Sequence, residues 1–287
     1  LPERVPAAQH GAASGLKSAF EILGFVLGKQ IGGSLVARGM VPAALATAGG
    51  SVVLALAITL LVDQRPGEAS APPRRGSPPQ PGWPRGLAAW FGNRFFVWSG
   101  FILLNTFLLF YAMDVLGLTE PEAQRLVARL SLAIGAALLA VTLPAGWLSD
   151  RIGRLPVLAA AGGVAVVGTA LVLAARSADD ILVAALLLGL GIGVFLSASW
   201  ALLTDIVPSS EAGRYMGIAN IATAGGSALA RLTGGLLIDP LNRWLGSLVG
   251  GYRIVYAIAL LAFVVGTLLL MGLRRVPRPS PLACPEA

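Results

Sequence analysis

The chain has 287 residues, of which 56% are hydrophobic and only 12% charged, and its mean hydropathy is +0.78. This balance excludes an ordinary soluble domain and is typical of packed transmembrane helices. The formal net charge is +7, but the cations lie mostly between apolar runs and form no basic, aromatic-rich helix face, so nucleic acid is not expected as a partner. With one cysteine and one histidine, neither a metal cluster nor a cofactor is expected.

Apolar stretches long enough to cross a bilayer, which takes about 20 residues, recur along the chain. We place eight spans, at 11–37, 41–62, 90–115, 124–148, 155–176, 181–204, 212–238 and 252–273. The region 63–89 interrupts the pattern with charges and with Pro, Gly and Ser, and the tail 274–287 is similar. The predicted fold class is therefore an all-α integral membrane protein surrounded by a lipid bilayer.

The arginines indicate which segments face the cytoplasm, because loops on that side are enriched in Lys and Arg. One set of segments carries twelve arginines and the other set six. The larger set includes Arg94, which is counted here with the linker region. The linker and the tail are expected to be cytoplasmic, and an even number of helices then places both ends of the chain there. The expected location is the plasma (inner) membrane.

The first and seventh spans are related by an internal repeat with a constant offset of 202 residues. The identical pairs are Val5 and Val207, Pro6 and Pro208, Gly11 and Gly213, Gly15 and Gly217, Gly24 and Gly226, and Gly33 and Gly235. Six identities in one register indicate two equivalent helices in two half-bundles. A parallel pseudo-repeat of this kind, about an axis along the membrane normal, is one way in which secondary transporters are built.

The segment Gly-Trp-Leu-Ser-Asp-Arg-Ile-Gly-Arg at 146–154 resembles the loop signature of the major facilitator superfamily, which follows the second helix of each six-helix half. Taken as the second-half copy, it makes the first span the fifth helix of that fold, and the repeat agrees. The resemblance implies two helices of the first half at 1–62, a cytoplasmic linker at 63–89, a complete second half at 90–273 and a cytoplasmic tail at 274–287. Helices one to four would be absent from this chain and are expected as its partners.

This loop signature is also the candidate gate. Glycine permits a tight turn, and Asp150 lies where a carboxylate can meet an arginine or a helix N-terminus. The resemblance implies that such a contact latches one state of the transport cycle. The alternative is a positively charged cytoplasmic turn without a gating role. Asp205, at a helix end, is expected to meet a cation such as Arg214. The candidate gating residues are Gly146, Asp150, Arg151, Gly153, Arg154, Asp205 and Arg214.

Polar and charged residues inside the spans predict a solute pathway, because ionisable groups are costly in a bilayer. Glu21 lies near mid-span, and Lys17, one turn away, is its expected partner, in either a functional or a structural pair. Lys29 and Arg231 lie eight and seven residues before their spans end, where long side chains can also snorkel. The candidate cavity residues are Lys17, Glu21, Lys29, Asn105, Trp200, Asn220, Thr223, Ser227 and Arg231.

Three functions remain open from the sequence. The first is transport of a small organic solute by alternating access, coupled to a proton or another cation through Glu21; the run at 205–220 resembles glycoside and sucrose-type symporters. The second is drug/proton antiport, because the glycine pattern around Lys29 resembles an antiporter motif with proline at that position. The third is a non-transporting scaffold or assembly factor. An enzyme is not expected, since one His and one Cys supply no nucleophile with its base.

Overall fold

The structure is a computed structural model that describes residues 10–61, 84, 86–207, 211–247 and 249–273, apart from a few side chains, most of them in the first helix and including that of Lys29. These residues form eight α-helices and no strand. The helices are α1 (His10–Ala37), α2 (Val41–Leu61), α3 (Leu87–Asp114), α4 (Glu120–Ile152), α5 (Arg154–Ala174), α6 (Ala178–Ile206), α7 (Ala212–Leu245) and α8 (Gly250–Leu273). Each predicted span corresponds to one helix, which confirms the all-α membrane fold.

Seven helices, α2 to α8, are long and apolar enough to cross a membrane over their described residues. The remaining helix, α1, has 28 residues, which is also long enough, and includes Lys17, Glu21 and Lys29. One difference from the predicted spans concerns α7, which continues past Pro240 to Leu245 instead of ending at 238. Arg231 therefore lies fourteen residues from the end of its helix, twice the distance expected from the sequence.

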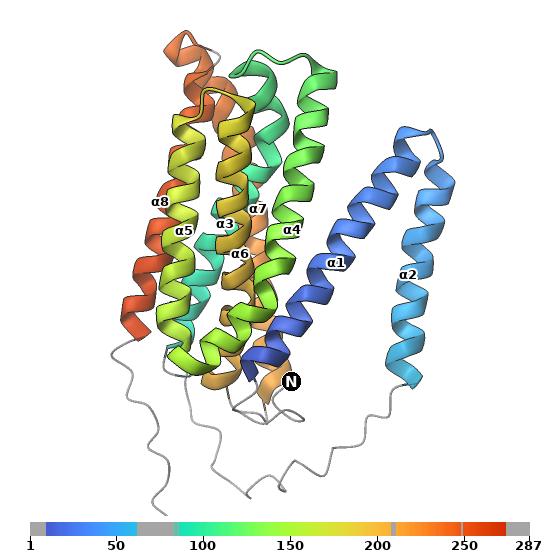
Figure 1. Cartoon of the computed structure of the whole chain (residues 1–287), viewed down its shortest axis with the longest axis vertical. Coiled ribbons are helices and arrows are strands. Elements are labelled where there is room, and N and C mark those ends of the chain that lie inside the picture. The colour runs from blue at the N-terminus through green and yellow to red at the C-terminus, as the bar shows by residue number, and fades with distance from the viewer. Residues whose placement is uncertain (1–9, 62–83, 85, 208–210, 248, 274–287) are drawn as a thin grey trace, which may run out of the picture.

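The helices α3 to α8 form one bundle, and α1 and α2 form a hairpin beside it (Figure 1). We call the end of the molecule at which α2 ends, at Leu61, and α3 begins, at Leu87, the linker end. There α1 contacts α4 and α6, and it diverges from α4 toward the opposite end (Figure 1). Side-chain exposure follows this geometry, because Ser14 and Ser18 are buried whereas Leu27 is half exposed.

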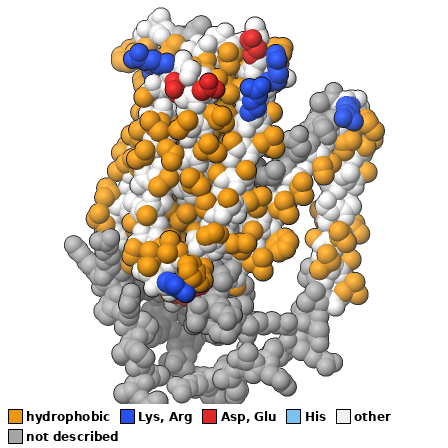
Figure 2. Space-filling model, in the orientation of Figure 1, with side chains coloured by type: hydrophobic (Ala, Val, Ile, Leu, Met, Phe, Trp, Pro, Cys, Tyr) orange, Lys and Arg blue, Asp and Glu red, His pale blue; other side chains and the backbone are white. Residues whose placement is uncertain are grey.

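Apolar side chains cover the sides of the helices, and on the face shown in Figure 2 the charged side chains gather toward the two ends. Large aliphatic side chains such as Leu60, Val53 and Leu236 are more than half exposed. Apolar surface of this extent is compatible with lipid contact and not with water.

Two glycines let helices approach closely. A Cβ atom at Gly15 would lie 2.8 Å from the carbonyl oxygen of Thr142 in α4, and one at Gly226 would lie 2.8 Å from that of Phe95 in α3. A Cβ atom at either of their repeat partners, Gly217 and Gly24, would have no described atom of another segment within 4 Å. Of the four glycines in these two pairs, one on each twin helix is therefore in close contact with a neighbouring helix.

The close contact at Gly15 predicts a steric test of how α1 seats against α4. Gly15→Val should separate the two helices at the linker end, because a branched side chain would meet backbone, with a cost of about 1–3 kcal/mol. A cysteine at the buried Ser197, which faces Gly15, should then react faster with a thiol reagent. Gly28→Val, at a position without a described neighbour, is the matched control and should leave the rate unchanged. Equal labelling rates in the two variants would contradict this packing.

Candidate functional site: a charged cluster between α1, α3, α6 and α7

The side chain of Arg94 lies in the interior of α3 and only 3% of the residue is exposed. Its Nε donates a hydrogen bond to Thr223 Oγ1 of α7 at 2.9 Å, and one of its terminal nitrogens donates to Ser199 Oγ of α6 at 3.3 Å. The assignment of Arg94 to the linker cations was therefore wrong, because the residue lies about two turns inside α3 and its side chain is buried in the bundle. The remaining arginines still show the same excess on that side.

The indole of Trp200 is the centre of the cluster. The guanidinium carbon of Arg94 lies 4.3 Å from the ring centroid, and Lys17 Nζ of α1 lies 4.2 Å from it. A cation over an aromatic face is attracted by the ring quadrupole, and more strongly where water is excluded. Trp200 thus connects a charge of the α1–α2 hairpin with a charge of the main bundle.

Glu21 forms an ion pair with Lys17, as their spacing of four residues predicts. The Lys17 side chain is 35% exposed and that of Glu21 51% exposed, so the pair lies on the open side of the cluster. Glu21 also interacts electrostatically with Arg94. One carboxylate therefore acts on two cations from different helices.

Several polar atoms around Trp200 are buried without a hydrogen-bond partner among the described residues. They are the hydroxyls of Ser14, Ser18 and Ser197 and the indole N–H of Trp200. An unmade hydrogen bond at a buried donor costs about 1–3 kcal/mol. A cost of this kind is expected at a contact that opens, or at a place that a ligand fills.

The polar stripe predicted on α7 divides between two environments. Thr223 bonds Arg94, and Ser227 Oγ accepts a hydrogen bond from Trp98 Nε1 at 2.9 Å. Asn220 and Arg231 are instead exposed on the same helix. The structure thus brings Thr223, with Lys17, Glu21 and Trp200, to the charged cluster, while Arg231 lies farther along α7.

Two predicted cavity residues remain, Asn105 and Lys29. Asn105 lines a separate cavity of about 30 Å³ within the bundle, beside Leu108, Ile134 and Tyr256. The side chain of Lys29 lies outside the described part of the chain.

Sequence reasoning missed Arg94, Trp90 and Ser199 as site residues. Trp90 Nε1 donates to the carbonyl oxygen of Ser199 at 2.8 Å, and Arg94 bonds the hydroxyl of the same serine. A signal was present, because Arg94 falls inside the predicted span 90–115 with a tryptophan four residues before it and another, Trp98, four residues after it.

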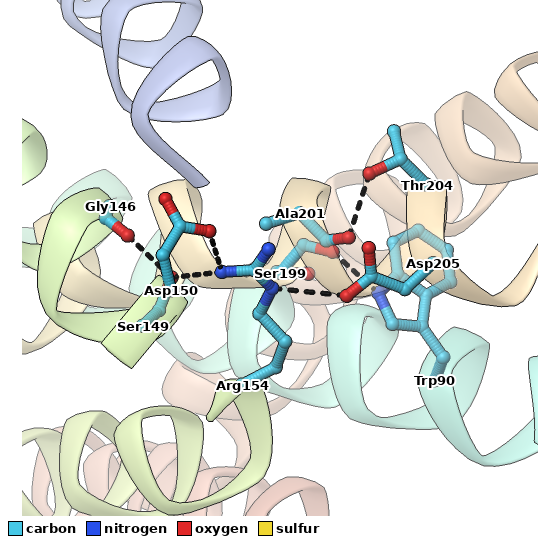
Figure 3. A network of polar contacts seen from close by, with 9 residues as sticks. All are labelled: Trp90, Gly146, Ser149, Asp150, Arg154, Ser199, Ala201, Thr204 and Asp205. Atoms are coloured by element: carbon cyan, nitrogen blue, oxygen red, sulfur yellow. Dashed lines mark hydrogen bonds and ion pairs between the residues drawn. The ribbon is translucent and has the colours of Figure 1, made fainter. Parts of the chain in front are cut away.

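The residues of the loop signature form a second polar network at the linker end (Figure 3). Arg154 pairs with Asp150, its terminal nitrogen donates to Ser149 Oγ at 2.9 Å, and its Nε lies 3.1 Å from Asp205 Oδ2 of α6. Ser149 Oγ in turn donates to the carbonyl oxygen of Gly146 at 2.8 Å. One guanidinium thus joins the end of α4, the start of α5 and the end of α6.

The remaining gating candidates are placed differently from one another. Arg154 forms an ion pair with Asp205, and Arg214 pairs with Glu211 at 3.2 Å. Arg151 turns away from the network, with its guanidinium carbon 3.8 Å from the ring centroid of Trp147. Sequence spacing indicated a cation for Asp205 but not that it would come from α5, because that contact joins residues 51 positions apart.

Gly153 separates α4 from α5 and has φ 99° and ψ 155°. Side-chain-bearing residues almost never adopt this conformation, so the turn depends on glycine. The turn places Arg154 one residue later, where it meets both carboxylates.

A family model described as Major Facilitator Superfamily matches residues 91–286. The minor myo-inositol transporter IolF of Bacillus subtilis is 30% identical over 185 residues, which cover 63% of this chain and 40% of that protein. An uncharacterised MFS-type transporter of Mycobacterium tuberculosis is 29% identical over 140 residues, which cover 48% of this chain and 20% of that one. These matches span less than half the length of either relative.

Among solved structures, a bacterial homologue of the iron transporter ferroportin in its outward-facing state has a similar fold. The TM-score is 0.69 and the sequence identity 15%, with 94% of this chain and 65% of that chain covered. At this identity the likeness concerns the fold alone.

The linker-end network predicts a difference between two neighbouring arginines. Arg154→Gln should lower the free energy of unfolding of the main bundle by about 1–2 kcal/mol, since it leaves two partly exposed carboxylates without their shared cation. Arg151→Gln, which removes only the contact with Trp147, should have a smaller effect. Thermal unfolding of the detergent-solubilised protein measures both. A larger effect at Arg151 would contradict the assigned contacts.

Gly153 allows a second test of the same turn. Gly153→Ala should destabilise the protein by about 1–3 kcal/mol, because alanine is strained at this φ and ψ. Gly163→Ala, in the interior of α5 at a position where a Cβ atom has nothing within 4 Å, is the control and should be neutral or slightly stabilising. Equal unfolding temperatures for the two variants would argue against the backbone conformation at 153.

Proposed function

The chain belongs to the major facilitator superfamily, and on that premise we propose that it acts in the transport of a small organic solute across the membrane by alternating access. The proposed transport is sugar-type symport, coupled to a proton through Glu21. The observation that carries this proposal is the cluster at Trp200, where Lys17, Glu21 and Arg94 meet inside membrane-spanning helices. Ionisable groups within membrane-spanning segments are energetically costly, and in membrane proteins they mark transport pathways.

The arrangement of the helices supports a role in alternation between two states. In the described structure α1 is seated on α4 and α6 at the linker end and stands away from α4 at the other end (Figure 1). Rocking one half-bundle against the other would open the linker end and close the opposite end around a fixed site. The buried hydroxyls without partners at the α1–α6 contact make this seat less stable than a fully satisfied one, which favours reversible opening.

We assign the linker-end network a gating role in this cycle. Arg154, Asp150 and Asp205 fix the α4–α5 turn to the end of α6, and α6 also carries Ser199 and Trp200 of the charged cluster. A rigid α6 would transmit a change at the cluster to the linker end. The linker end would face the cytoplasm of a plasma-membrane protein, in keeping with the excess of arginines there.

The relationship to an inositol transporter supports a polyhydroxylated solute, since that relative is described as transporting myo-inositol. The serine hydroxyls beside Trp200 could hydrogen-bond such a solute, and the flat indole could pack against its ring. Glu21 is the one carboxylate at the cluster among the described residues and is exposed on its open side, which suits an exchangeable proton.

Proton coupling through Glu21 predicts a specific transport defect. In proteoliposomes of the complete protein, a proton gradient should drive solute accumulation, and Glu21→Gln should abolish this accumulation while leaving solute exchange without a gradient measurable. Glu120→Gln, an exposed carboxylate at the start of α4, is the matched control and should behave like the parent.

The same assay distinguishes the other functions. A panel of sugars and polyols is compared with lipophilic cations under gradients of either direction. Proton-driven extrusion of the lipophilic cations would indicate drug antiport and contradict the proposal. Unaltered cellular function of a Glu21 and Arg94 double variant, together with no solute movement, would indicate a scaffold.

A further inference from the structure

The charged cluster has more positive than negative charge. Lys17 is neutralised by Glu21, but Arg94 has only the hydroxyls of Ser199 and Thr223 as hydrogen-bond partners among the described residues, and no carboxylate forms an ion pair with it there. One carboxylate therefore serves two cations. Burial of a cation whose charge is only partly balanced by nearby negative charge is energetically unfavourable unless a further anion binds beside it.

The hydrogen-bonding groups at the site are mostly donors. A guanidinium has five N–H donors in a planar fork, and the bonds to Ser199 and Thr223 use two of them. The indole N–H of Trp200 is also buried and without a partner in the described structure. A site with unpaired donors and surplus positive charge favours a ligand that brings acceptors and negative charge.

The same sign of charge continues along the helices that surround the cluster. Between their ends, α1, α3 and α7 carry four cations, Lys17, Lys29, Arg94 and Arg231, against two carboxylates, Glu21 and Asp239. A low-dielectric path in which one sign of charge predominates concentrates solutes of the opposite sign. This surplus favours an anionic sugar derivative over a neutral sugar.

We propose that the transported solute is a small organic anion, whose carboxylate or phosphate group binds between Arg94 and Lys17 against the indole of Trp200. This inference rests on the proposed transport function and names its substrate class. The planar fork of Arg94 suits bidentate contact with a carboxylate or a phosphate, and Lys17 adds a mobile point charge from the other half-bundle. The hydroxyls of Ser14, Ser18 and Ser197 suit an anion that also carries hydroxyl groups.

The test compares two anions with a neutral polyol on the whole protein in lipid nanodiscs. The probes are gluconate, glucose 6-phosphate and myo-inositol, and the readout is the rise in melting temperature with probe concentration, from which an apparent Kd follows. At least one anion should stabilise the parent protein at a concentration where myo-inositol does not. Gluconate alone would identify a carboxylate site, and glucose 6-phosphate alone a phosphate site.

Variants at Arg94 then assign the effect to this residue. Arg94→Gln should weaken binding of the stabilising anion about tenfold or more, since a hydrogen bond to a charged group is lost. Arg94→Lys keeps the positive charge and should lose only part of the affinity. It replaces the glutamine variant if that variant fails to fold. Arg243→Gln, at the end of α7 away from the cluster, is the matched control and should bind like the parent.

Three results would overturn the inference. Stabilisation by myo-inositol alone, unchanged in Arg94→Gln, would show a neutral-solute site and leave the proposed transport function intact. Stabilisation by an anion that Arg94→Gln does not weaken would place the anion elsewhere. No stabilisation by any of the three probes would reject the anion site, whereas the transport function would fall only if the proteoliposomes also moved no solute.

Discussion

The burial of a guanidinium inside the membrane-spanning bundle is the constraint around which the rest of the site is arranged. Only 3% of Arg94 is exposed, so its surroundings must supply hydrogen bonds and compensating charge. Three helices supply part of this: Ser199 and Trp200 of α6, Thr223 of α7 and, electrostatically, Glu21 of α1. A change in the position of α1 therefore changes the environment of this charge directly.

This dependence connects the solute site to the seat of α1. Lys17, which is paired with Glu21, can reach Trp200 only while the first half of α1 lies on α4 and α6, and that approach is possible because Gly15 has no side chain. The hydroxyls buried without partners at the same contact reduce its stability. Close packing and unmet hydrogen bonds thus oppose each other there, which is the condition for a contact that forms and breaks in a transport cycle.

Much of the fold could be predicted from the sequence, because hydropathy and glycine spacing are local signals. The eight spans and the Lys17–Glu21 pair follow from such signals, and the loop signature at 146–154 gave the family. The end of α7 could not be predicted, because Pro240 is compatible with a continuing helix when its neighbours are in place. The bond between Arg94 and Thr223 joins residues 129 positions apart and has no local signature. Position near a linker suggested a surface cation, whereas three-dimensional packing makes Arg94 a buried one.

The proposed solute site lies at Trp200, between a cation of α1 and a cation of α3. An experimental structure of the whole protein with its transported solute bound would locate the solute directly. Solute density is expected against the indole of Trp200, with polar atoms within hydrogen-bond distance of Arg94 or Lys17. Solute bound instead in the cavity beside Asn105, or elsewhere with the Arg94 and Lys17 contacts unchanged from those described, would contradict it.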